Sequence, residues 1–144
     1  APIILGLDGS QKMSKSRNNA IMLSADEEET ARLIKKAKTD PGRTITYDPE
    51  NRPEVSNLLL LISLTTGRKP EEIAAEIGDG GAGQLKKVLT ESLNEYLRPL
   101  RARRKELEQN LDYVRDVLRS GIAAAREVAV KTLEEVREVM NMKI

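Results

Sequence analysis

After residue 24, the apolar residues recur at helical spacings and no segment alternates with period two. This pattern predicts a mainly α-helical fold. We expect helices from Ser24 to about Asp40, over 53–66 and over 70–77, with a flexible joint at 78–83. Apolar stripes follow over 85–96, 100–118 and 122–140, with a bend or restart at Pro99 and a break at Gly121. These three stripes are long enough to pack as a helical bundle.

One short segment does not fit this helical pattern. Residues 3–7, Ile3-Ile4-Leu5-Gly6-Leu7, form an apolar run typical of a buried strand. A lone strand is not stable in water, and we find no partner strand later in the chain. The sheet either lies outside this sequence or the segment is a tail. Since the chain begins without Met and already in an apolar run, we expect a part of a longer protein.

The composition excludes several kinds of chemistry. The 144 residues include no His and no Cys, which excludes histidine-based catalysis, His-ligated zinc and disulfides. We also find no metal-ligand spacing. Lys and Arg (24) nearly balance Asp and Glu (23), so an argument for nucleic acid must rest on local clusters. No apolar run is long enough to span a membrane, and the lack of Cys fits a cytoplasmic protein.

The stretch "GSQKMSKSRNN", residues 9–19, directly follows the apolar run and is suited to a polyphosphate ligand. Glycine allows backbone N–H groups to approach an anion closely. Lys12 and Lys15 supply mobile positive charges, and Ser14 and Ser16 can donate hydrogen bonds to phosphate oxygens. A solvated basic loop is the plainer interpretation of such a pattern. The phosphate-binding loop GxxxxGK[ST] is absent.

The letters Lys12-Met13-Ser14-Lys15-Ser16 resemble the KMSKS loop of class I aminoacyl-tRNA synthetases, which follows a strand of their Rossmann-type sheet. Within that class, most of the chain is similar to the C-terminal part of bacterial tryptophanyl-tRNA synthetases. The similar segments are 31–40 (ARLIKKAKTD), 47–73 (YDPENRPEVSNLLLLISLTTGRKPEEI), 93–107 (LNEYLRPLRARRKEL) and 121–140 (GIAAAREVAVKTLEEVREVM). Tyrosyl-tRNA synthetases are a poorer match and remain an alternative.

The resemblance implies roles for the loop residues. Lys12 and Lys15 are expected to act in catalysis by contacting the phosphates of ATP, which would enter as a complex with Mg²⁺. Ser14 and Ser16 would bond phosphate oxygens, and Met13 would lie near the adenine through its main chain. The resemblance also places Ile3 beside the adenine. Such a loop positions and neutralises charge while the amino acid carboxylate attacks the α-phosphate.

The resemblance also implies a division of the chain. Residues 1–24 would be the last strand and KMSKS loop of a truncated Rossmann-type catalytic domain, and 25–144 the helical region of the anticodon-binding type. The second ATP motif of the class, HIGH, contains histidine, so it would lie on another part of the parent enzyme, together with the tryptophan pocket. We expect the fragment alone to be inactive and the full enzyme to be a homodimer.

The expected partner of the helices is tRNA(Trp). A basic run, Arg98, Arg101, Arg103, Arg104 and Lys105, lies in an expected helix, and Arg126 lies in the last one. We predict RNA contacts by Arg101, Arg103, Arg104 and Arg126. Solvated helices also carry such charges, with nearby acids as partners. A stand-alone helical module that binds RNA or protein, without enzyme activity, is therefore the alternative from another class.

Overall fold

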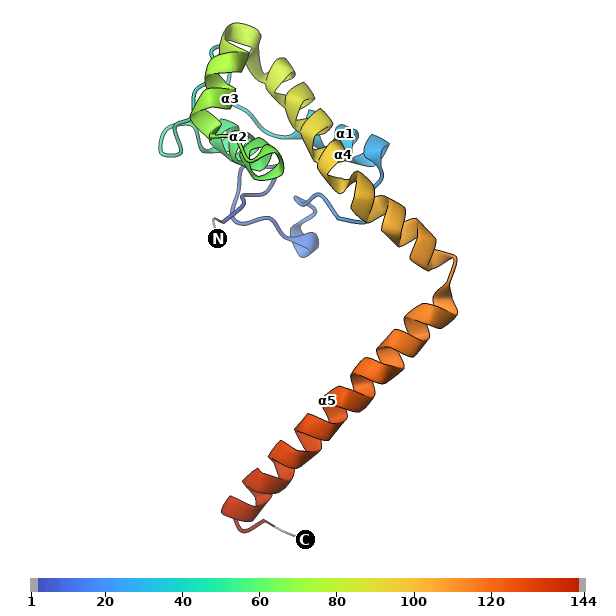
Figure 1. The fold of residues 1–144 in the computed structure, drawn as a ribbon. Coiled ribbons are helices and arrows are strands. Elements are labelled where there is room, and N and C mark those ends of the chain that lie inside the picture. The colour runs from blue at the N-terminus through green and yellow to red at the C-terminus, as the bar shows by residue number, and fades with distance from the viewer. Residues whose placement is uncertain (1–2, 143–144) are drawn as a thin grey trace. The chain divides into compact units, whose positions relative to one another are not determined.

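The computed structural model describes residues 3–142, and these are mostly helical (Figure 1). The α-helices are α1 (Glu27–Lys36), α2 (Pro53–Thr66), α3 (Pro70–Ile77), α4 (Gly81–Glu108) and α5 (Leu111–Val139), with two 3-10 turns, η1 (Lys15–Arg17) and η2 (Gly78–Gly80). The chain divides into two compact units, Ala1–Arg101 and Ala102–Ile144. The predicted division at residue 24 concerns the parts of the family's enzyme and stays a prediction.

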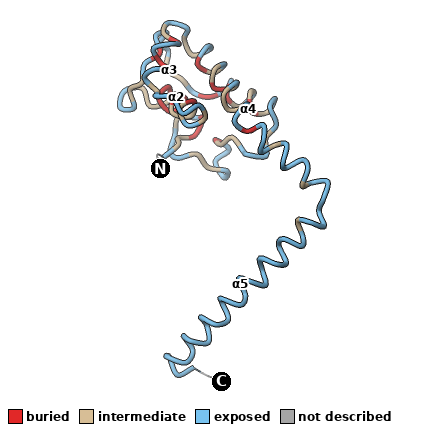
Figure 2. The backbone as a smooth tube through the Cα atoms, in the orientation of Figure 1, coloured by how far each residue is buried: buried red, intermediate tan, exposed pale blue. Residues whose placement is uncertain are grey.

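Helix α2 is the centre of the first unit. Its side chains Val55, Leu58, Leu59 and Ile62 are almost completely buried, as the run of leucines predicts. Helix α3 packs beside α2 (Figure 1). The same core also contains residues from the other segments of the unit: Leu7, Ile34, Ala37, Ile45, Ile73, Ala74, Ile77, Leu85 and Leu89. Figure 2 shows this buried set in red. The core is aliphatic, as the composition requires.

Residues that favour helix ends mark the bounds of several helices. Helices α2 and α3 each begin at a proline, where the missing N–H has no partner to lose. Helix α2 ends at Gly67, which adopts φ of 74°. The first cap differs from the prediction: Asp26 rather than Ser24 caps α1, because its carboxylate accepts the backbone N–H of Glu29 at 2.8 Å.

The segment between α1 and α2 is held by Arg52. Its guanidinium forms a two-bond pair with Asp40, Nε to Oδ2 at 2.8 Å and Nη2 to Oδ1 at 2.7 Å. Its Nη1 donates to the carbonyl oxygen of Thr44 and to Thr46 Oγ1. The same pairing holds the pKa of Asp40 below its ordinary value. Arg52 therefore fixes the approach of the chain to the central helix.

The predicted strand does not form in the described residues. Residues 3–7 contribute a single antiparallel bridge, between Leu5 and Lys12. The reason is that a strand needs a neighbouring strand along its length, and here the main-chain groups of Leu5 are bonded by the side chain of Asn57. The mainly helical fold is confirmed, while the place of residues 3–7 as a strand in a Rossmann-type sheet stays a prediction.

The second unit is mostly α5, and this helix differs from the prediction. Gly121 does not interrupt it, because one glycine in a 29-residue helix costs only about 1 kcal/mol. The break lies earlier, at Asn110, whose side chain accepts the N–H of Tyr113 at 3.3 Å. No described residue of α5 is buried (Figure 2). The packing of its apolar stripe in a bundle stays a prediction.

Candidate functional site

The predicted phosphate-binding segment is a closed loop in the first unit. The Leu5–Lys12 bridge closes residues 6–11, and beside it Met13 N donates to Ile4 O at 2.8 Å. Gly6 N donates to Gln11 O at 3.1 Å inside this bridge. These bonds form the base of the loop, at Lys12 and Met13. The loop therefore has a fixed structure rather than the irregular form of an unsupported basic segment.

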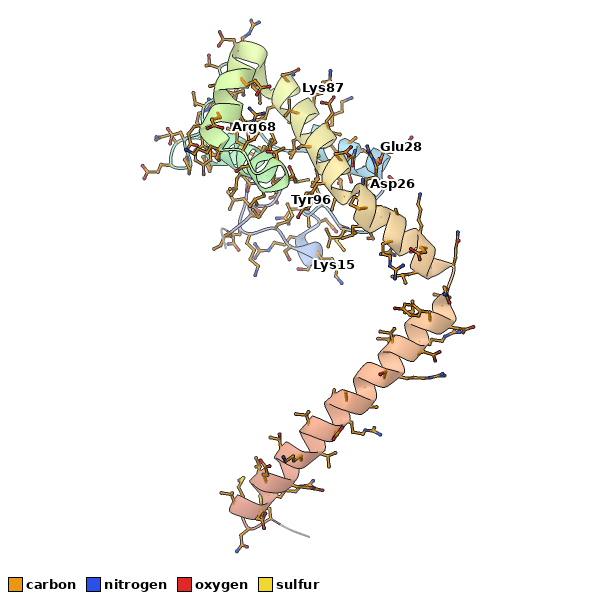
Figure 3. All side chains as sticks on the ribbon, viewed as in Figure 1. Lys15, Asp26, Glu28, Arg68, Lys87 and Tyr96 are labelled. Atoms are coloured by element: carbon orange, nitrogen blue, oxygen red, sulfur yellow. The ribbon has the colours of Figure 1, made fainter. Side chains whose placement is uncertain are left out.

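The loop presents its two lysines to solvent. Lys12 follows the base, and Lys15 begins the turn η1, where Figure 3 labels it at the surface of the unit. Asn18 ends this turn in the left-handed conformation, with φ of 53°. Lys15 also borders an open groove of about 460 Å³ that includes Asn18 and Arg32. Both ammonium groups are accessible to an anionic ligand.

The hydroxyls of the motif lie next to each other. Ser14 Oγ and Ser16 Oγ are 3.0 Å apart, and both side chains lie at the surface or partly exposed. Met13 differs from them because its side chain packs against the core. Ile3, which the resemblance places beside the adenine, is 72% exposed. The structure thus brings Lys12, Ser14, Lys15 and Ser16 together on one loop and leaves Ile3 outside it.

Two asparagines organise the loop, and the sequence analysis missed both. Asn19 accepts the N–H of Ser14 at 2.8 Å and donates to Asp8 Oδ1 at 3.2 Å. Asn57, on α2, accepts the N–H of Leu5 at 2.9 Å and donates to its carbonyl at 3.0 Å. A usable signal for Asn57 was an amide directly before the apolar run 58–62, since buried polar groups need partners.

Asp8 is the only acid within the loop, residues 6–19, and it is engaged internally. Its Oδ1 accepts the N–H of Ser10 at 3.0 Å and the hydroxyl of Ser10 at 2.8 Å. These hydrogen bonds to the charged form lower the pKa of Asp8 below its ordinary value. The carboxylate therefore stays ionised near neutral pH and shapes the loop instead of pairing with either lysine.

The four arginines predicted to contact RNA occupy different environments. Arg101 directs its nitrogens inward, to Ala25 O, Asn94 Oδ1 and Thr30 Oγ1. Arg103 and Arg104 are exposed and pair with Glu106 at 2.6 Å and Glu108 at 2.7 Å. Arg126 is exposed on α5. Arg101 has a structural use in this unit, and the RNA roles of all four stay predictions.

The side chains of Tyr96 and Tyr113 are also more accessible than their positions in the apolar stripes indicate. Tyr96, labelled in Figure 3, is 59% exposed, and Tyr113 is 49% exposed. In the described part of the chain, no three His, Cys, Asp or Glu residues lie close enough to hold a metal ion. Nor is any helix in residues 3–142 long and apolar enough to cross a membrane.

Comparison with known proteins assigns the loop and helices to a family. The family model described as tRNA synthetases class I (W and Y) matches residues 1–98. The chain belongs to this family. Tryptophan–tRNA ligase of Nostoc sp. is 40% identical over 137 residues, which cover 93% of this chain and 41% of the relative. The tryptophan–tRNA ligase of Aquifex aeolicus is 39% identical over 147 residues, 98% of this chain and 36% of the relative.

Solved structures have a similar fold. The tryptophanyl-tRNA synthetase of Campylobacter jejuni, complexed with ADP and tryptophan, matches with a TM-score of 0.74 and 25% identity, over 98% of this chain and 44% of that one. The enzyme of Mycoplasma pneumoniae matches with a TM-score of 0.58 over 70% of this chain and 35% of that one. This member of the class I synthetase family thus spans about two-fifths of the length of the relatives that it matches.

Proposed function

We propose that this chain is the loop-and-helix part of a tryptophan–tRNA ligase, and that its loop binds the triphosphate of ATP during tryptophan activation. The observation that carries the proposal is the KMSKS loop itself, with Lys12 and Lys15 exposed above a hydrogen-bonded base. The names of the curated relatives favour tryptophan over tyrosine as the amino acid.

In this reaction the carboxylate of tryptophan attacks the α-phosphorus of ATP. A bond forms between that oxygen and phosphorus, the bond to the β-phosphate oxygen breaks, and pyrophosphate leaves with the electron pair. Negative charge therefore grows on the departing pyrophosphate. Lys12 and Lys15 would stabilise that charge more strongly in the transition state than in bound ATP, which accelerates the reaction.

The two serine hydroxyls would add directional hydrogen bonds to the charge of the lysines. Ser14 and Ser16 lie within 3.0 Å of each other, so one phosphate oxygen can receive a hydrogen bond from either. The ammonium groups need no fixed orientation, because each carries three donors on a flexible stem. The magnesium ion would enter with ATP as part of the substrate, held by phosphates and water.

A lysine series in the full-length protein that contains this chain tests the proposal. We expect Lys15→Ala to lower kcat for tryptophan-dependent pyrophosphate exchange by roughly a hundredfold or more, as for a group that acts on developing charge. The KM for tryptophan should change little. Lys87→Ala is the matched control, because Lys87 is an exposed lysine on α4, outside the loop (Figure 3). An unchanged rate in Lys15→Ala would reject the role of the loop.

The same assay decides the amino acid. Exchange that depends on tryptophan and not on tyrosine supports the tryptophan–tRNA ligase, and the reverse result supports the tyrosine branch of the family. No exchange with either amino acid, in a full-length protein that folds, would favour a helical binding module. The homodimer implied by the resemblance stays a prediction, which sedimentation velocity of the full-length protein can measure.

A further inference from the structure

We propose that two buried amides, Asn57 and Asn19, are positioning residues that hold the loop of residues 6–19, which contains Lys12 and Lys15, from its two ends. Asn57 fastens the chain before the loop to helix α2, and Asn19 ties the end of the loop back to Ser14. The catalytic consequence rests on the proposed function, whereas the structural consequence does not.

Asn57 takes the place of a neighbouring strand. Its amide oxygen accepts the N–H of Leu5 at 2.9 Å, and its amide nitrogen donates to the Leu5 carbonyl at 3.0 Å. This donor-and-acceptor pair is what an adjacent strand would offer. Asn57 is 6% exposed and is followed by Leu58 and Leu59, which are 1% and 0% exposed. The chain before the loop is therefore bonded to the buried part of α2.

The same residue connects this contact to the lysines. Leu5 is the bridge partner of Lys12, and the neighbouring Ile4 carbonyl accepts the N–H of Met13. The Asn57 amide is thus connected to the motif through two sets of hydrogen bonds, those from Asn57 to Leu5 and the one between Ile4 and Met13. A displacement of Leu5 would move the base from which Lys12 projects.

Asn19 holds the other end. Its side-chain oxygen accepts the N–H of Ser14 at 2.8 Å, and its main-chain oxygen accepts the N–H of Leu7 at 2.9 Å. Its nitrogen donates to Asp8. Asn19 is only 3% exposed, although both of its chain neighbours are more accessible. One buried side chain therefore joins the beginning and the end of the loop.

Gly6 shows how closely Asn19 is fitted. A Cβ atom built at Gly6 would lie 2.0 Å from Asn19 Nδ2 and 2.4 Å from its Cγ, which no real contact allows. The φ angle of Gly6 is not in the left-handed region, so its backbone does not require glycine. The space beside Gly6 is therefore taken by the amide itself.

This arrangement fixes the main chain of the loop and leaves its lysine side chains able to move. Both amides bind main-chain groups below the lysines and leave the ammonium groups free. Fixed main-chain positions reduce the freedom that must be lost when the phosphates bind, which favours the transition state. Loss of either amide should weaken catalysis without removing a group that touches ATP.

Amide hydrogen exchange in this chain tests the structural part. Asn57→Asp keeps the shape and the acceptor for Leu5 N–H but places a carboxylate against the Leu5 carbonyl. We expect exchange of the Met13 and Ser14 amides to accelerate about tenfold or more, as for local opening of a hydrogen-bonded unit. Asn51→Asp is the matched control, because Asn51 is exposed in the turn before α2. Acceleration confined to Leu5, or no acceleration, would overturn the coupling.

A second variant keeps the test independent of the core. Asn19→Asp retains the acceptor for the Ser14 N–H but places a second carboxylate beside Asp8. Because residue 19 is not part of α2, the leucines of that helix are unchanged. Circular dichroism should show unchanged helix content, and the Leu7 and Ser14 amides should exchange faster. Unchanged exchange in a folded Asn19→Asp chain would overturn the role of Asn19.

Pyrophosphate exchange in the full-length protein tests the catalytic part. We expect Asn57→Asp and Asn19→Asp to lower kcat about tenfold, because the groups that touch ATP remain, with the KM for tryptophan nearly unchanged. If Lys15→Ala has no effect, the proposed function fails. If Lys15→Ala slows exchange but both asparagine variants have normal kcat, the positioning role fails and the proposed function stands.

Discussion

The Arg101 Nη2 donates a hydrogen bond to Thr30 Oγ1 at 2.8 Å, although 71 residues separate them in the chain. Thr30 is fully buried, and its hydroxyl donates to the carbonyl of Asp26 at 2.7 Å. Arg101 Nε also donates to the Ala25 carbonyl at 2.9 Å. Arg101 therefore fastens the beginning of α1 to α4 inside the first unit.

This use of Arg101 predicts different stability effects for two neighbouring arginines. Arg101→Ala should lower the free energy of unfolding by about 1–3 kcal/mol, because it removes the donor to the buried Thr30 hydroxyl and to the partly buried Ala25 carbonyl. Arg103→Ala should change it by less than about 0.5 kcal/mol, since Arg103 is exposed and its salt bridge is to the exposed Glu106. Urea unfolding followed by circular dichroism measures both. Equal effects of the two substitutions would show that Arg101 is not a fastening point.

Two glycines with the same backbone conformation predict a second difference. Gly9 and Gly67 have φ of 72° and 74°, so alanine at either should cost about 1–2 kcal/mol from backbone strain. A Cβ at Gly67 meets nothing within 4 Å, whereas at Gly9 it would lie 2.5 Å from Cγ of Glu54. Gly9→Ala should therefore also displace Glu54 from Lys38, its partner at 2.9 Å.

The pKa of Glu54 reports whether Gly9→Ala displaces this side chain from Lys38. Lys38 lowers the pKa of Glu54 in the intact chain, chiefly through the hydrogen bond between them. In Gly9→Ala, an NMR titration should find the pKa of Glu54 returned toward its ordinary value, while Gly67→Ala leaves it low. A low pKa of Glu54 in both variants would mean that the carboxylate accommodates the new methyl group.

The helices of the core could be predicted because their limits are local. Proline at the first helical position and glycine after the last one mark α2 and α3 without reference to the rest of the fold. The interruption between α4 and α5 carried a similar local signal, Asn110, but Gly121 was the more conspicuous residue. Glycine weakens a helix without ending it when no competing structure is available.

The candidate site also has parts that are local in sequence and parts that depend on distant residues. The lysines and serines of the loop are a contiguous sequence motif, so their grouping was predictable. The roles of Asn57 and Arg101 depend on bonds to residues 52 and 71 positions away, which no local pattern contains. The strand at residues 3–7 depends on a distant partner in the same way, and in the described residues the main chain of Leu5 is bonded by the side chain of Asn57.

The Asp8 carboxylate predicts how the loop responds to acid. Hydrogen bonds from Ser10 and Asn19 lower the pKa of Asp8 below the ordinary value of 3.8. The contribution to loop structure is therefore complete above about pH 4 and is lost as the pH falls through the lower, folded-state value. The chemical shift of the Ser10 amide should report one such transition, which Asp8→Asn removes. A transition in that variant would have to come from another acid.

The exposed arginines of the second unit predict a salt-dependent affinity for tRNA. Arg103→Ala and Arg126→Ala should each weaken binding of this chain to tRNA and reduce the slope of log affinity against log salt by roughly 1, if each contacts one phosphate. Glu106→Gln should act in the opposite direction, because Glu106 holds Arg103 at 2.6 Å and raises its pKa. Arg32→Ala, which removes an exposed arginine paired with Glu29 on α1, is the control. Filter binding between 50 and 200 mM salt, roughly the range over which phosphate contacts are lost, measures all four variants. Slopes that fall equally in Arg32→Ala would show a general charge effect and contradict a contact surface on the second unit.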